Sequence, residues 1–165
     1  MGRYGADLTF LRPFFNVREG PRQSAALIKN AGAALPLSAA TVGHVFVVGP
    51  MANASQANSG YYGPKQACGG NFWNMVDAVA AHAGHVTTAL GVPSFDSADE
   101  SGIPAAVASA KLADTVVMVV GAGLGWAHEG HDAKSIAFTP AQLALIANVS
   151  AAAKKPVVYG NLDII

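Results

Sequence analysis

The chain has 165 residues, which is enough for one domain of ordinary size. Hydrophobic residues make up 52% of it, ample for a buried core, whereas charged residues make up only 12%, about half of the usual share. Ten Lys and Arg balance ten Asp and Glu, so the formal net charge is zero. Nucleic acids and anionic membranes attract proteins with a basic excess, so the sequence predicts neither as a partner.

Cysteine content and apolar run length exclude further classes. Cys68 is the only cysteine, which excludes an internal disulfide and a cysteine-based zinc site. The longest nearly apolar stretch, residues 115–127, is shorter than the ~18 residues of a membrane span, so no transmembrane helix is predicted. The first fifteen residues lack the apolar region and cleavage site of a signal peptide, and the compartment stays open.

Low charge and a mean hydropathy of +0.33 indicate that a partner or a further domain covers part of the surface.

Glycine and proline divide the chain into segments whose hydrophobic period alternates between helical and strand-like. Helices are predicted over four segments: residues 21–30, residues 71–82 with Asn71 as the cap, residues 103–112 with Pro104 in the first turn, and a last helix from Thr139, opened by a capping box with Gln142. Strands are predicted over four others: residues 44–49, 85–90, 114–121 and a strand that starts at residues 157–159.

This alternation predicts an α/β fold with a mostly parallel sheet and helices on both faces. Ligands of such sheets gather at the carboxyl ends of the strands, so the loops to consider follow Gly49, Leu90, Gly121 and Tyr159. The loop between Gly121 and Pro140 is too long for a plain connection, which marks it as a candidate functional loop.

Two interpretations of this loop are disfavoured by its spacing. Dinucleotide binding needs G-x-G-x-x-G opening directly into a helix, but Trp126 interrupts that pattern and the next helix begins well downstream. A zinc site would use His128 and His131, yet three-residue spacing aligns them only on a helix, which Gly130 disfavours. A metalloprotease would need histidine in place of Asp132.

The third interpretation is a carboxyl group that donates a proton to a substrate. Glu129 lies close to Trp126 in the sequence, and an indole can both desolvate a carboxylic acid, which raises its pKa, and stack on the apolar face of a sugar. The alternative is an ordinary surface carboxylate.

Several sequence motifs of this chain resemble those of one protein family and follow one another in the same order as in that family. Residues 22–30 and 35–37 are similar to "A-x-x-S-x-x-L-L-K-N … L-P-L", residues 47–54 to "V-x-G-P-x-A-N-A", and residues 61–64 to "G-N-Y-x-G-x-P". Residues 114–142 resemble "A-D-x-V-V-x-V-x-G … E-x-E-G-x-D-R … L-P-x-x-Q". The set resembles the carboxyl-side α/β/α sandwich domain of glycoside hydrolase family 3, especially its β-xylosidase-like branch. We therefore expect a three-layer sandwich over residues 18–165, truncated, after an extension of residues 1–17.

The resemblance implies hydrolysis of terminal β-linked sugars with retention, by two carboxyl groups about 5 Å apart. In that family a preceding (β/α)8 barrel supplies the nucleophilic aspartate, and the loop matched here by residues 121–140 supplies the acid/base glutamate. The implied partners are a carbohydrate substrate and a missing N-terminal barrel, with no cofactor and no metal. Members of the family are often secreted.

The departures from the pattern define the candidate site. The first glutamate of "E-x-E-G-x-D-R" falls on Ala127, and the arginine falls on Ala133. Glu129 is therefore the candidate catalytic acid only if the loop shifts by about two residues. Trp126, His131 and Asp132 are the candidate sugar-binding residues.

Three functions stay open from the sequence. The first is a fragment or reduced form of a β-xylosidase or β-glucosidase, weak or inactive alone. The second is a non-catalytic carbohydrate-binding or interaction module, and the third is a flavodoxin-like nucleotide binder.

Overall fold

The computed structural model describes residues 23, 25–55 and 72–161, and the chain divides into two compact units, Met1–Leu35 and Pro36–Ile165. The described part of the first unit holds a short 3-10 turn, η2 (Ala31–Ala33). The helix predicted over residues 21–30 is wrong for residues 25–30, which are exposed and carry no helix.

Exposure accounts for this difference. All six residues are exposed, and a short helix without packing is only marginally stable in water. The side chain of Asn30 bonds to the next segment, where it donates a hydrogen bond to the carbonyl of Leu35 and accepts one from the Leu35 N–H, both at 2.9 Å.

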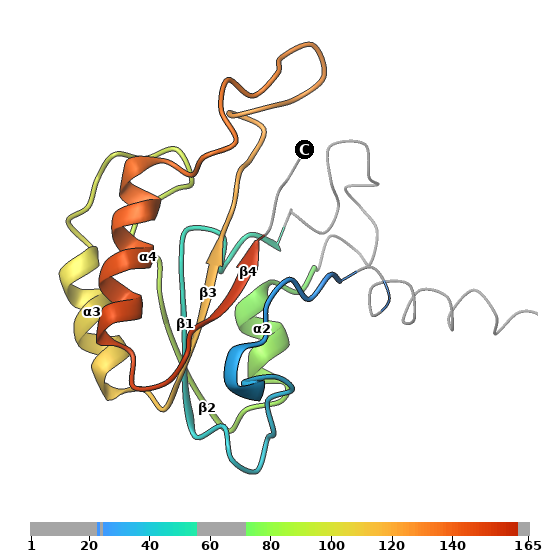
Figure 1. The fold of residues 1–165 in the computed structure, drawn as a ribbon. Coiled ribbons are helices and arrows are strands. Elements are labelled where there is room, and N and C mark those ends of the chain that lie inside the picture. Colours follow the sequence, from blue (N-terminus) through green and yellow to red (C-terminus); the bar gives the residue numbers. More distant parts are fainter. Residues whose placement is uncertain (1–22, 24, 56–71, 162–165) are drawn as a thin grey trace, which may run out of the picture. The chain divides into compact units, whose positions relative to one another are not determined.

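The second unit is built on a parallel sheet of four strands, β1 (His44–Val48), β2 (His85–Ala89), β3 (Thr115–Val120) and β4 (Val158–Asn161). Their spatial order is β2-β1-β3-β4, and all three pairings are parallel (Figure 1). The predicted parallel sheet is therefore confirmed. Because the strands run the same way, their carboxyl ends share one edge of the sheet.

Helices cover both faces of this sheet and give the predicted three-layer α/β/α sandwich (Figure 1). On one face lie α3 (Ile103–Leu112) and α4 (Pro140–Ala152), and on the other lies α2 (Met75–Ala80). All six residues of β3 are buried because helices cover both of its faces. No helix in the described part of the chain is both long and apolar enough to cross a bilayer.

Each face of the sheet has its own apolar core, because successive strand residues point to opposite faces. The core beneath α3 and α4 includes Phe46, Val48, Met118 and Leu145. The core on the α2 side includes Val45, Val47, Met51 and Val119.

Helix α2 is shorter than the predicted helix over residues 71–82, and its cap differs. Asn74 caps it by accepting from the Asp77 N–H at 2.9 Å, while the Asp77 carboxylate accepts from the Asn74 N–H at 3.1 Å. Asn71 lies outside the described residues, as do Cys68, the phrase at residues 61–64 and the boundary expected after residue 17. The strand predicted over residues 85–90 and the helix predicted over 103–112 are confirmed.

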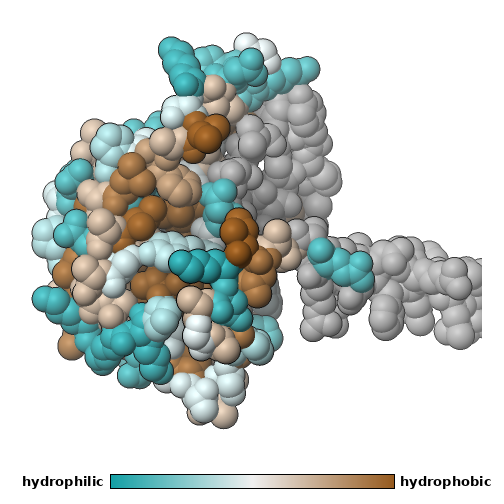
Figure 2. Space-filling model, viewed as in Figure 1, coloured by the Kyte–Doolittle hydropathy of each residue, from teal (hydrophilic) through white to brown (hydrophobic). Residues whose placement is uncertain are grey.

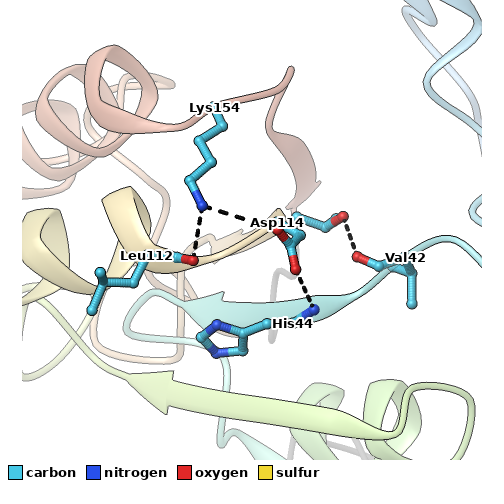
Figure 3. A network of polar contacts seen from close by, with 6 residues as sticks. Val42, His44, Leu112, Asp114 and Lys154 are labelled. Carbon is cyan, nitrogen blue, oxygen red and sulfur yellow. Dashed lines mark hydrogen bonds and ion pairs between the residues drawn. The ribbon is translucent and has the colours of Figure 1, made fainter.

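A polar network joins several elements at the amino-terminal edge of the sheet (Figure 3). The Asp114 carboxylate accepts from the backbone N–H of His44 at 2.9 Å and lies 3.9 Å from the ammonium of Lys154. That ammonium also donates to the carbonyl of Leu112 at the end of α3, at 3.0 Å. The hydrogen bond from His44 is the main cause that lowers the pKa of Asp114, with a smaller contribution from Lys154.

We expect Asp114 to make folding stability depend on acidity. Its folded-state pKa lies below the ordinary value of 3.8, so its contribution is present above about pH 3.8 and is lost as the pH falls through the folded pKa. Asp114→Asn should lower the urea midpoint at neutral pH, and its difference from wild type should shrink in acid. Glu100→Gln, at an exposed site, is the control. A variant with the full acid dependence of wild type would contradict the assignment.

Gly49 should be intolerant of any side chain. It follows β1 with φ +129°, and a Cβ there would collide with the carbonyl oxygen of Val119. Gly49→Ala should lower the free energy of unfolding by about 3 kcal/mol or more. Gly84→Ala is the matched control, because nothing lies within 4 Å of its Cβ position, and it should change stability by less than ~0.5 kcal/mol. Similar urea midpoints for the two variants would show this prediction to be wrong.

Candidate functional site at the carboxyl edge of the sheet

The strand order locates the place where a ligand would bind. The chain passes from β1 to β2 on one side and then returns to β3 on the other side of β1. Loops that leave two neighbouring strands in opposite directions open a crevice at their carboxyl ends. The loop of residues 121–139, called the 121–139 loop below, leaves β3 at this position and extends beyond the edge of the sheet (Figure 1, orange).

The root of this loop is held by a side chain of α4. Gln142, fully buried, accepts from the Gly121 N–H at 3.1 Å and donates to the Gly121 carbonyl at 3.0 Å. Its amide also donates to the carbonyl of Phe95 at 2.8 Å. The predicted capping box is confirmed for Thr139, whose hydroxyl accepts from the Gln142 N–H at 3.4 Å. The predicted role of the Gln142 side chain in that box is wrong, because this side chain bonds to the backbones of Gly121 and Phe95 instead.

Phe95 belongs to the loop of residues 90–102, which follows β2, and it packs against the start of the 121–139 loop. A Cβ on Gly123 would lie 2.5 Å from Cε1 of the Phe95 ring, so only glycine permits this approach. Two loops that are far apart in sequence therefore form one base for the site.

The outer end of the 121–139 loop is a tight turn with Glu129 and Gly130 at its apex. The His128 N–H donates to the His131 carbonyl at 3.0 Å, and the His131 N–H donates back at 2.8 Å. Gly130 has φ +79°, the conformation that the third residue of a type II turn requires. The turn makes Glu129 exposed, and Figure 2 shows a hydrophilic loop end, with apolar residues gathered lower down over α4.

The two histidines of the turn stack on each other, with ring centroids 5.1 Å apart and planes inclined by 14°. Nδ1 of His128 is 2.9 Å from the carbonyl of Leu124, a distance at which the ring N–H donates to that oxygen. Among the described residues, no group of three or more histidine, cysteine or acidic side chains is placed to hold a metal ion.

An open depression of about 360 Å³ lies against the loop. It is lined by Gly125, Trp126, His131, Lys134, Ser135 and Thr139. The Trp126 indole N–H donates to the Ser135 carbonyl at 3.1 Å, which fixes the ring at the rim. The depression is open to solvent, so it offers a surface on which a ligand can lie rather than an enclosed pocket.

The structure thus brings together two of the four predicted site residues. Trp126 and His131 line the depression, whereas Glu129 and Asp132 are exposed and do not line it. Sequence reasoning missed Lys134, Ser135 and Thr139, and the only signal for them was membership of the same long loop. They meet Trp126 because the turn at residues 128–131 folds the chain back on itself.

A parallel α/β/α sandwich with a long loop at its switch point defines a broad class of ligand-binding domains. Comparison with known proteins narrows the class. Residues 25–162 match the glycosyl hydrolase family 3 C-terminal domain, and the chain belongs to that family.

Named relatives are similar to this chain over most of its length. Beta-D-xylosidase 3 of Arabidopsis thaliana is 34% identical over 153 residues, and beta-xylosidase/alpha-L-arabinofuranosidase 2 of Medicago sativa subsp. varia is 32% identical over 152. Each alignment covers 89% of this chain and 19% of the relative, so the chain spans about 19% of the length of these proteins.

Solved structures agree with the fold. A family 3 exo-beta-xylosidase in complex with a xylobiose aziridine activity-based probe has a TM-score of 0.76 and 27% identity, over 93% of this chain and 19% of that one. A beta-glucosidase from Listeria innocua has a TM-score of 0.77 over 98% of this chain and 22% of its own. At 23% identity, this second likeness supports the fold alone.

Proposed function

We propose that this chain is the sandwich part of a retaining glycosidase that hydrolyses terminal β-xylosides or β-glucosides. The observation that carries the proposal is membership of the glycosyl hydrolase family 3 C-terminal domain family over residues 25–162. The names of the two relatives, a β-xylosidase and a β-xylosidase/α-L-arabinofuranosidase, support β-xylosides as the substrate class. The position of the 121–139 loop at the switch point of the sheet supports it as the part that meets the sugar.

In this proposal Glu129 donates the proton to the leaving oxygen, and Trp126 stacks on the sugar ring. His131 and Asp132 bind sugar hydroxyls. Glu129 at the apex of an exposed turn can reach a substrate held on a facing surface. It does not line the depression of its own domain, which favours a substrate shared with another domain.

The proposed facing surface is a (β/α)8 barrel that carries the nucleophilic aspartate. Retention needs two carboxyl groups about 5 Å apart on opposite sides of the scissile bond. This division of the site explains why its acid would project from the sandwich while its sugar-stacking tryptophan lines the depression of the sandwich itself. The relatives have ample length for such a barrel, because this chain matches only 19% of each.

A second function, carbohydrate binding without catalysis, is favoured by one feature of the loop. Ala127 stands where the family pattern has its first glutamate, and Ala133 stands where it has arginine. A loop that lost both charged groups but kept Trp126 at an open depression suits binding better than proton transfer.

A turnover experiment separates the two functions. The chain alone should release no nitrophenol from nitrophenyl β-xyloside, because the nucleophile is missing. Mixed with the barrel domain of a family 3 β-xylosidase deprived of its own sandwich, it should restore turnover. Glu129→Gln should then lower kcat by about 10²- to 10⁴-fold, the usual contribution of a general acid. Glu100→Gln, on a different loop, should leave it unchanged. Full turnover by the isolated chain, or restored turnover that survives Glu129→Gln, would contradict the assignment.

Sugar binding should depend on Trp126. Trp126→Ala should weaken xylobiose binding in calorimetric titration by at least about tenfold, or ~1.4 kcal/mol, because it removes the stacking surface. Trp73→Ala removes an exposed indole that precedes α2 and serves as the matched control. Equal losses for the two variants, or no loss for Trp126→Ala, would place the sugar elsewhere.

A further inference from the structure

We infer that Gln142 is the positioning residue of the site: it fixes the 121–139 loop on the sheet and couples it to the loop of residues 90–102. Its role in sugar chemistry rests on the proposed function, whereas the coupling itself rests only on the contacts of this chain.

Gln142 serves the loops rather than the packing of its own helix. The other buried residues of α4 are apolar, namely Ala141, Leu145 and Val149. An apolar side chain at position 142 would continue that face. Glutamine is polar at a fully buried position, and such a residue is stable only when its hydrogen bonds are made.

Every hydrogen-bonding group of the Gln142 side-chain amide has a partner. Its oxygen accepts from the Gly121 N–H, and its two N–H groups donate to the carbonyls of Gly121 and Phe95. Gly121 is the residue at which the chain leaves β3, so both polar groups of its backbone are satisfied by one side chain. Removal of Gln142 would leave buried backbone groups unpaired, which costs more than one hydrogen bond is worth.

The contacts of Gln142 also join the 121–139 loop to the loop of residues 90–102. The Phe95 carbonyl accepts from the Gln142 amide at 2.8 Å and from the Thr139 hydroxyl at 3.3 Å. The Phe95 ring in turn packs on Gly123, two residues beyond the point that Gln142 holds. A change in either loop is therefore transmitted to the other through the first turn of α4. Trp126 lies five residues after Gly121, so its place at the rim depends on this anchor.

Two substitutions test the coupling. Gln142→Leu removes all three hydrogen bonds. Gln142→Glu keeps an acceptor for the Gly121 N–H but turns a carboxylate toward two carbonyl oxygens. Amide hydrogen exchange should rise at least about tenfold at Trp126, His128 and His131 in both variants, while the amides of β1 keep their protection. Gly121 should stay protected in Gln142→Glu and lose protection in Gln142→Leu.

A pH profile supplies a readout that lost packing would not give. In Gln142→Glu the introduced carboxyl is buried against two carbonyls, so acid should protonate it and restore a donor. Loop protection, corrected for intrinsic exchange, should then recover as the pH falls. Gln142→Leu should show no recovery. Equal behaviour of the two variants in acid would overturn the inference.

Val149→Ala is the matched control, because Val149 is as fully buried as Gln142 and lies two turns further along the same helix. It should raise exchange across the sheet without selecting the loop. If the Gln142 variants fail to fold, Thr139→Val removes the second hydrogen bond to Phe95 together with the cap of α4, and it should give the same selective rise, smaller in size. Thr139→Ser keeps the hydroxyl and should leave loop exchange unchanged. Unchanged loop exchange, or a rise spread as evenly as in Val149→Ala, would also overturn the inference.

This test is separable from that of the proposed function, because hydrogen exchange needs no sugar. A chain that shows the coupling but neither binds xylobiose nor restores turnover to the barrel domain contradicts the proposed function alone. A chain that binds xylobiose but whose 121–139 loop keeps its wild-type hydrogen exchange in the Gln142 variants contradicts the positioning role alone.

Discussion

The parallel pairing of β1 with β3, both buried on their two faces, is the constraint on which the other features of the sandwich depend. Their register sets Val47 opposite Val117 and places every second side chain in one of two separate apolar cores. Two cores require two helical layers. The same pairing makes the position between β1 and β3 the switch point, because β2 and β4 lie on the outer sides. The location of the candidate site therefore follows from how the core is packed.

The 121–139 loop is ordered at its root and open at its apex. At the root, Gln142 satisfies the backbone of Gly121 inside the core. At the apex, a single two-residue turn presents Glu129 to solvent. Buried hydrogen bonds resist local opening far more than exposed ones, so the fluctuations of this loop should grow with distance from Gly121. A rigid root with an adaptable end suits a loop that has to meet a separate surface.

Sequence patterns predicted the helices and strands that are specified by local residues or by a strong hydrophobic period. The apolar runs at residues 44–49 and 114–121 are short, continuous, rich in β-branched residues and closed by a glycine, a pattern typical of strands buried on both faces of a parallel sheet. Residues 25–30 show the opposite case, because their spacing is helical but all six are exposed, and a short helix without packing is only marginally stable. Gln142 occupies a capping-box position, and only tertiary structure decides between its local partner and the backbone of Gly121. The depression around Trp126 needs the turn at residues 128–131, which no spacing rule encodes.

The separation of Glu129 from the depression bears on how a site can be divided between two domains. A carboxyl group that donates a proton works best when it is partly desolvated, because burial raises its pKa toward the working pH. Glu129 is exposed in this chain, and the residues nearest to it in sequence, Gly130 and His128, form a turn rather than a pocket. Desolvation would have to come from a surface that closes over the turn. Under the proposed function, the facing barrel would therefore supply the nucleophile and also close the site around the carboxyl on the opposite side of the scissile bond.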